Sequence, residues 1–132
     1  MSGMNITKIL HGSMTLAIDA KSADFTTISE LTEIKCDGFN KLMIQYILST
    51  TDWDRAGNID IYGAFYPTGT YTAFNFTIEN YSFTVSATAD SGVGSGEIYI
   101  IENVPPCVKL AWDNTTPGTT GTISVYAMPF NG

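Results

Sequence analysis

Apolar and polar residues alternate along most of the chain, a pattern that is typical of β-strands with one buried face. The alternation is densest from Lys41 to Pro67, where two apolar runs flank a polar loop. Both faces of the first run are mostly apolar: one carries Leu42, Ile44, Tyr46 and Leu48, and the other carries Met43, Gln45 and Ile47. This run predicts either an inner strand covered on both sides or a strand whose outer face meets another subunit.

The second run predicts a strand with a glycine on its apolar side. One face carries Ile59, Ile61, Gly63 and Phe65, and the other carries Asp60, Tyr62, Ala64 and Tyr66. A glycine inside a strand indicates a bulge or the close approach of another segment, so we expect one of these at Gly63. A turn is predicted directly afterwards, at residues 67–70.

Six further segments have a period of two residues, namely 13–18, 71–78, 81–87, 97–102, 107–113 and 121–129. Residues 25–31 fit either a strand or a short helix, and Asp37-Gly38 marks a turn with a positive φ angle. This spacing predicts an all-β fold, an antiparallel, jelly-roll-like β-sandwich of about eight or nine short strands. Residues 1–12 lack a period and are interpreted as an N-terminal arm or edge strand, and residues 13–132 as a single domain.

Composition narrows the range of partners. Only 14% of the 132 residues are charged, and the net charge is −7 with six Lys and Arg in total. Such a chain has no basic footprint for nucleic acid and is disfavoured at anionic membranes. No apolar run approaches the roughly 18 residues of a membrane span. The N-terminus lacks a signal-peptide pattern, so we expect synthesis in a cytoplasm, where Cys36 and Cys107 stay free thiols; their spacing alone leaves a disulfide open.

Catalytic chemistry finds little support. The single histidine, His11, lies in the unpatterned N-terminal segment, and no serine has a nucleophile-elbow motif. One histidine and two distant cysteines match no common zinc spacing. The Gly-rich segment 91–96 lacks the lysine and the following helix of a phosphate-binding loop. Asp60 and Glu97 are candidates for an acid pair, but the sequence does not bring them together. We expect no enzyme activity, no cofactor and no catalytic residue.

The loop between the two dense runs is the most distinctive local constellation. Asp52 and Asp54 have the spacing of a calcium loop, with Gly57 at its sixth position. Ala56 occupies a ligand position, however, and the bidentate glutamate of such a loop is missing. A structural turn without a metal is therefore favoured. The alternatives are a weak cation site or a recognition loop anchored by Trp53.

Aromatic residues make up 12% of the chain and suggest a recognition surface. Exposed aromatic rings on a sandwich stack on sugars or anchor a protein partner, whereas buried ones only pack. The predicted recognition or interface residues are Asp52, Trp53, Asp54, Tyr62, Tyr66, Tyr71 and Tyr99, on loops or outward strand faces.

The last third of the chain carries a family resemblance. The segment C-V-K-L-A-W-D-N-T-T-P-G-T-T-G-T-I-S-V-Y-A-M-P-F resembles the closing hairpin of small bacteriophage virion proteins, which are capsid decoration, cement, head-fibre or tail accessory subunits. The upstream I-D-I-Y-G-A-F-Y-P-T-G-T-Y-T-A-F resembles one of their strands and turns, so the likeness covers Ile59 to Phe130. It implies assembly in a virion, with the major capsid protein or other virion subunits as partners and a homo-oligomer, favoured as a trimer.

These observations together predict a capsid decoration or cement subunit that stabilises a viral shell through non-covalent contacts, with the N-terminal arm as a docking element. The alternative is a carbohydrate- or receptor-binding module of a phage fibre or tail that uses Trp53 and nearby aromatic rings, which makes a glycan a possible partner. A small hydrolase is a third class, which the single histidine disfavours.

Overall fold

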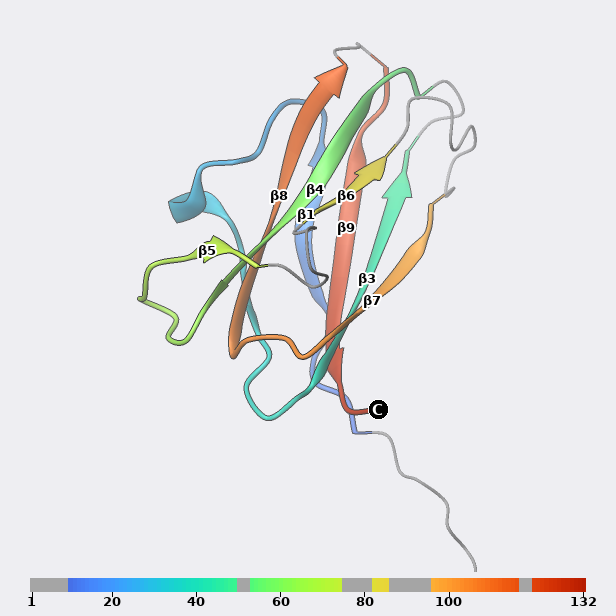
Figure 1. Ribbon diagram of the computed structural model, residues 1–132. Helices are drawn as coiled ribbons and strands as arrows, with labels where there is room; N and C mark the ends of the chain where they lie inside the picture. The colour runs from blue at the N-terminus through green and yellow to red at the C-terminus, as the bar shows by residue number, and fades with distance from the viewer. Residues whose placement is uncertain (1–9, 50–52, 75–81, 86–95, 117–119) are drawn as a thin grey trace, which may run out of the picture.

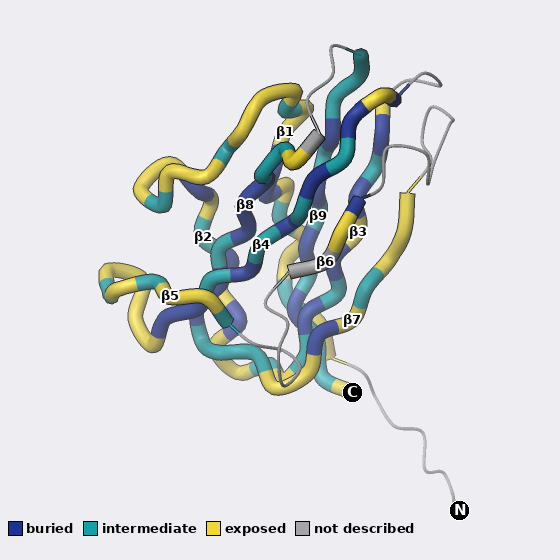
Figure 2. The backbone as a smooth tube through the Cα atoms, turned by 45° about the horizontal axis from the view of Figure 1, so that its top comes forward, coloured by how far each residue is buried: buried dark blue, intermediate teal, exposed yellow. Residues whose placement is uncertain are grey.

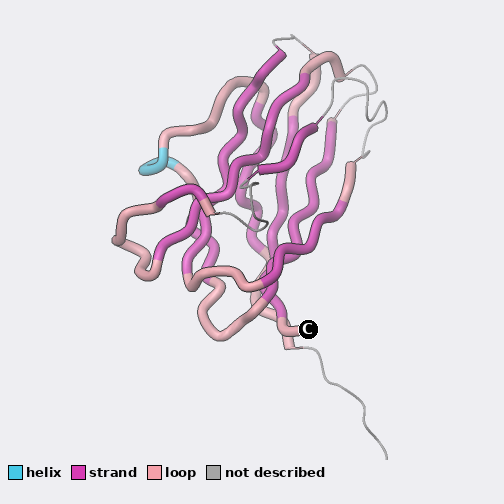
Figure 3. Tube along the Cα trace, viewed as in Figure 1, coloured by secondary structure: helices cyan, strands magenta, loops and turns pink. Residues whose placement is uncertain are grey.

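A computed structural model describes residues 10–49, 53–74, 82–85, 96–116 and 120–132. These residues form nine strands and one short 3-10 helix, which are shown in Figures 1 and 3. The strands are β1 (Thr15–Lys21), β2 (Glu33–Lys35), β3 (Lys41–Leu48), β4 (Ala56–Ala64), β5 (Thr72–Ala73), β6 (Ser82–Val85), β7 (Ile98–Glu102), β8 (Cys107–Thr116) and β9 (Ile123–Phe130), and the helix is η1 (Ile28–Glu30). The predicted all-β fold is confirmed.

The strands form two antiparallel sheets that pack as a sandwich (Figure 1). One sheet has four strands in the order β1-β9-β3-β7, and the other has β2-β8-β4-β5, with β6 also paired to β4. Successive strands alternate between the sheets except along β4, β5 and β6, which stay together. This alternation is the double Greek key of a jelly roll.

The edge strand beside β4 is made of two pieces. β5 pairs with Tyr62 and Gly63, the amide of Phe74 donates to the carbonyl of Ile61 at 2.8 Å, and β6 continues from Asp60 onward. The two pieces therefore occupy consecutive positions along β4. The sequence predicted separate strands at 71–78 and 81–87; within the described residues these are two parts of one interrupted edge strand, and residues 75–81 and 86–95 lie outside the description.

The core lies between the sheets and is built from the inward faces of the long strands, as the dark segments of Figure 2 show. The period of two predicted for residues 107–113 and 121–129 agrees with the burial on β8 and β9: Val108, Leu110, Trp112, Ile123 and Val125 are fully buried, and Ala127 nearly so. On β3, the face that carries Leu42 and Leu48 is buried, whereas Gln45 on the other face is exposed. The prediction of a strand covered on both sides is therefore wrong within this chain.

The N-terminal strand departs from strict alternation. The period of two predicted for residues 13–18 puts Met14, Leu16 and Ile18 on one face, but the register of β1 against β9 shifts between Leu16 and Ile18. This irregularity turns both Ala17 and Ile18 inward and leaves Met14 (67% exposed) and Leu16 (40% exposed) on the outer side. The predicted common face is wrong because a bulge adds one residue to the strand.

Other local predictions have mixed outcomes. Residues 25–31 form neither a full strand nor an α-helix, since Phe25 makes an isolated bridge to Trp112 and η1 follows. Gly38 adopts the expected positive φ of 87°. In the N-terminal segment, His11 pairs with Phe130 in a single bridge, and residues 1–9 lie outside the description. None of the described helices has the length and apolar character needed to cross a membrane.

Gly63 marks a close approach rather than a bulge. A Cβ atom at this position would lie 2.5 Å from Cγ of Pro105, closer than real carbon contacts allow. The absent side chain therefore lets the segment before β8 cross directly over β4. The expectation that Phe65 shares the buried face with Ile61 is wrong, because β4 ends at Ala64 and the Phe65 ring is 81% exposed.

Candidate functional site

Trp53, the predicted recognition anchor, belongs to the core. Its side chain is 5% exposed, and its ring centroid lies 5.9 Å from that of Trp112. The expectation of a surface ring at the tip of the loop is therefore wrong. The ring turns inward because the segment before β4 folds back over the open end of the sandwich, where Trp112 supplies an apolar partner.

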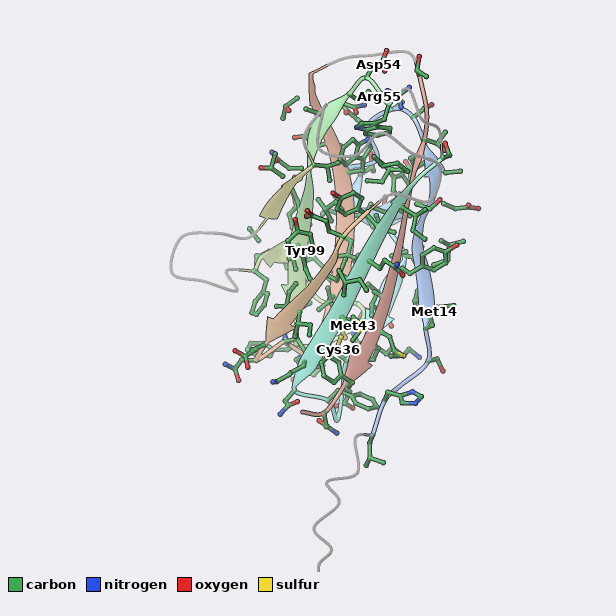
Figure 4. The ribbon with its side chains drawn as sticks, turned by 90° about the vertical axis from the view of Figure 1, so that its right-hand side faces the viewer. Met14, Cys36, Met43, Asp54, Arg55 and Tyr99 are labelled. Atoms are coloured by element: carbon green, nitrogen blue, oxygen red, sulfur yellow. The ribbon has the colours of Figure 1, made fainter. Side chains whose placement is uncertain are left out.

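Asp54 and Arg55, which follow Trp53, stabilise this end of the sandwich and are labelled in Figure 4. The Arg55 side chain is 2% exposed, lies 5.3 Å from the centroid of the Trp53 ring, and donates to the carbonyl of Gly121. The exposed Asp54 accepts a hydrogen bond from the amide of Thr120 at 2.9 Å. Both side chains thus tie the segment before β4 to the segment before β9. Asp52 lies outside the described residues.

The predicted tyrosines are spread over both sheets. Tyr62 and Tyr71 are half-buried on the outer side of the five-stranded sheet, where the Lys109 ammonium lies 4.5 Å from the Tyr71 ring centroid. Tyr99 packs inward from β7 against Tyr46, with centroids 6.5 Å apart, and donates its hydroxyl to the Glu97 carboxylate. Of the predicted aromatic set, Tyr66 is strongly exposed, at 70%. The seven residues therefore do not form one site.

Tyr66 and the adjacent Phe65 form an exposed aromatic tip on the hairpin between β4 and β5. The turn is closed by a 3.0 Å hydrogen bond from the amide of Gly69 to the carbonyl of Tyr66. Beside it lies an open pocket of about 350 Å³ whose lining includes Gly63, Phe65, Phe74 and Pro105. Such a hollow, with an aromatic wall and a glycine at its base, is able to receive an apolar side chain or a flat ring.

A second exposed apolar surface covers the outer side of the four-stranded sheet, which we call the methionine face. One row across the sheet consists of Met128, Met43 and Ile100, and the next consists of Leu16, Tyr126, Gln45 and Ile98. Met14 joins the first row, since it lines a shallow pocket of about 100 Å³ with Met43 and Met128. Figure 4 looks toward this side and shows Met14 and Met43 at the end away from Asp54.

Exposure and charge distinguish the methionine face from ordinary surface. Ile98 and Ile100 are 57% and 55% exposed, which is unusual for two isoleucines on one strand. Neither row contains a charged residue, although the chain carries a net charge of −7. At the Lys41 end of the face, Lys41 and Glu102 form a 3.2 Å ion pair. The second apolar side of β3 was visible in the sequence, but its continuation across three neighbouring strands required their register.

The two cysteines are free and buried. Burial, followed by the neighbouring Cys107, raises the pKa of Cys36 from 9.0 to about 12. Burial likewise raises the pKa of Cys107 above its usual value, and it raises that of Tyr71 to about 12. A thiol with a raised pKa is a poor nucleophile at neutral pH, so these side chains act as packing groups.

The remaining chemical candidates stay apart. Asp60 lies on β4 in the five-stranded sheet, whereas Glu97 precedes β7 of the four-stranded sheet. His11 is exposed, with its ring Nδ1 3.3 Å from the carbonyl oxygen of Gly12. Among the residues that the structure describes, no three or more His, Cys, Asp or Glu side chains gather closely enough to hold a metal ion. The described residues thus form two exposed apolar surfaces, the aromatic tip and the methionine face.

Comparisons with known proteins add a fold relationship. No protein-family model matches the chain, and no curated protein sequence matches it. Among solved structures, it is similar to the SPBc2 prophage-derived protein YomS, with a TM-score of 0.56 and 17% sequence identity. The alignment covers 97% of this chain and 99% of that protein. At this identity, the likeness shows that the two chains share a β-sandwich fold over their full lengths.

Proposed function

We propose that this chain is a virion structural protein, a capsid decoration or cement subunit that stabilises a viral shell through non-covalent contacts. The observation that carries the proposal is the exposure of apolar surface at two separate places, the aromatic tip and the methionine face. Figures 1 and 2 both show the β4–β5 hairpin on the side of the molecule opposite β7. A subunit with two opposed apolar surfaces is suited to link partners, as a component of an assembly does.

The aromatic tip is the surface that we assign to the shell. Exposed aromatic rings are the side chains that most often dominate the energy of a protein interface. Phe65 and Tyr66 project from a short hairpin, and the neighbouring pocket offers a receptor for a side chain of the partner. The turn is held by its own backbone hydrogen bond, so little ordering entropy is lost on docking.

Two further observations support a virion role. Double-sheet jelly rolls occur in viral capsid domains, although they also occur in lectins, so the fold alone does not choose between them. The structural neighbour is described as prophage-derived, which agrees with the resemblance of residues 59–130 to phage virion subunits. The proposal therefore places the chain in the virion, in contact with the major capsid protein or a neighbouring virion subunit.

The test is to purify virus particles from cells that make either the natural chain or the Phe65→Ala variant. Quantitative mass spectrometry then measures the chain per particle, and heat-induced release of the genome measures shell stability. We expect the natural chain in a fixed ratio to the shell protein, and a loss of at least tenfold for Phe65→Ala. Thr68→Ala, an exposed change in the same turn, is the matched control. Particles that contain none of the natural chain would refute the proposal.

The aromatic tip also favours the second candidate, a carbohydrate- or receptor-binding module of a fibre or tail. An exposed tyrosine is a suitable platform for a sugar ring, and Tyr66, which follows Phe65 of the pocket lining, takes the place that the sequence assigned to Trp53. A glycan array separates the candidates. Binding of the natural chain that is lost in Tyr66→Ala and kept in Thr68→Ala would support this module over the shell contact.

A further inference from the structure

We propose that the methionine face binds a second copy of this chain, so that two four-stranded sheets pack face to face around a two-fold axis near Gln45. This interface is separate from the aromatic tip, which is the surface that the proposed function assigns to the shell. Its failure is read from the mass of the purified chain, whereas the proposed function is read from the content of virus particles. The two proposals therefore stand or fall independently.

The size of the face suits a modest interface between two copies. Four strands spaced about 4.8 Å apart give a width of about 19 Å, and the six steps from Lys41 to Ile47 on β3 give a length of about 20 Å. The flat footprint is then about 400 Å², and the accessible area is larger because side chains protrude from the sheet. Two copies then share about 800 Å² of flat footprint in total, which is below the roughly 1,000 Å² of a specific interface, so we expect a weak, concentration-dependent dimer.

The side chains are suited to sheet-on-sheet packing. Stacked sheets lie about 10 Å apart and interdigitate their side chains. Met14, Met43 and Met128 have flexible side chains that fill irregular gaps, so two copies of the same face are able to adjust to each other. The shallow pocket that these methionines line offers a place for a protruding side chain of the facing copy.

Polarity favours a second copy over an unrelated partner. The exposed Gln45 amide lies in the middle of the uncharged rows, and an amide group both donates and accepts hydrogen bonds. A two-fold axis at this point brings Gln45 of each copy opposite the other, and each amide then satisfies its partner. If this axis runs across the strands, it places the Lys41–Glu102 ion pair of one copy over the Ile47 and Ser124 end of the other. Like charges therefore do not meet, despite the net charge of −7 on each copy.

The proposed two-fold dimer differs from the trimer that the sequence resemblance favours. A three-fold assembly requires two different complementary surfaces on each copy, because each contact is heterologous. The methionine face is a single flat surface, and a two-fold axis pairs such a surface with itself. A closed dimer leaves both aromatic tips free, on the outer sides of the pair, so each copy keeps its second contact.

The first test measures the mass of the full chain by light scattering after size-exclusion chromatography over a wide range of concentration. We expect a rise from the 14.3 kDa chain mass toward twice that value. Gln45→Glu, an isosteric change at an exposed position, places two carboxylates opposite each other and should weaken the dimer at least tenfold at neutral pH. Thr32→Glu adds the same charge at an exposed loop near the five-stranded sheet and should leave the dimer unchanged. A natural chain that stays monomeric, or that forms a trimer, overturns the proposal.

The second test locates the two-fold axis. Gln45→Cys should form a disulfide-linked dimer under mild oxidation, because only a two-fold contact brings this residue next to its own copy. Thr32→Cys is the control and should remain uncrosslinked, while Cys36 and Cys107 stay buried. A dimer that tolerates Gln45→Glu and does not crosslink through Gln45→Cys overturns the assignment of this face. If Met43 is protected from oxidation within virus particles but not in the free chain, the methionine face contacts the shell, and the dimer proposal is overturned.

Discussion

Replacing Trp53 with alanine tests whether this residue stabilises the fold or recognises a partner. The ring is 5% exposed, so the substitution removes a buried aromatic side chain, which typically costs about 3–5 kcal/mol. That figure includes the contact with Trp112, since aromatic pairs at such distances contribute about 0.5–1.5 kcal/mol. It also includes the Arg55 guanidinium over the ring, a contact of about 0.5–2 kcal/mol. We therefore expect a loss of about 4 kcal/mol in the free energy of unfolding.

A loss of this size is large relative to the stability of a domain. With an unfolding entropy of about 2.1 cal/mol/K per residue, 4 kcal/mol lowers the melting temperature of this chain by about 14 °C. Urea unfolding followed by circular dichroism measures the loss without relying on the altered fluorescence. Trp53→Phe keeps a ring against Trp112 and should lose less. A loss below about 1 kcal/mol in Trp53→Ala, together with loss of partner binding, would refute the core assignment and restore the recognition hypothesis.

Three further outcomes follow from packing and titration. Gly63→Ala should lower the free energy of unfolding by about 1–3 kcal/mol, because its Cβ would lie 2.5 Å from Pro105. A second change, Pro105→Ala, should restore most of this loss. If the effects of the two changes simply add in the double mutant, the contact is contradicted. The thiols of Cys36 and Cys107 should react with an aromatic disulfide reagent at neutral pH only at the rate of unfolding, and immediate labelling of the native chain would contradict their burial. The free energy of unfolding should fall as the pH rises from about 9 to about 12. The folded chain raises the pKa values of Cys36 and Tyr71 to about 12, whereas in the unfolded chain both side chains lose their protons at lower pH, which favours unfolding. Denaturant titrations at several pH values measure this slope, which Cys36→Ala should reduce.

The β-sandwich was predictable because one face of each long strand is buried. On β8 and β9, every second residue faces the core, and the chemical alternation of residues such as Val108, Leu110 and Val125 follows that geometry directly. The bulge in β1 was not predictable, because an extra residue changes the phase of the alternation without leaving a distinctive residue type. Leu16 and Ile18 therefore share a face in the sequence pattern, whereas in the structure Leu16 faces outward and Ile18 is buried.

The burial of Trp53 and the methionine face both illustrate what local patterns miss. Trp53 lies between two aspartates in the sequence, which favours a surface loop, and its burial depends on Trp112, far along the chain. The methionine face depends on register, because Met43 and Met128 become neighbours only when β3 pairs with β9. The apolar outer positions of each strand were visible separately. The order of the strands in the sheet had to be known before these positions could be recognised as one surface.

The interrupted edge strand has a consequence for how this domain tolerates change. Phe74 bonds to Ile61, and β6 resumes opposite Asp60, so the pairing along β4 continues as though the seven residues 75–81 were absent. We therefore expect extra sequence inserted between Phe74 and Ser82 to leave the pairing of β4 unaltered, since lengthening a connection has only a small entropic cost. This position is therefore the natural site for grafting a peptide epitope or an affinity tag, which a particle carrying this subunit would display in many copies.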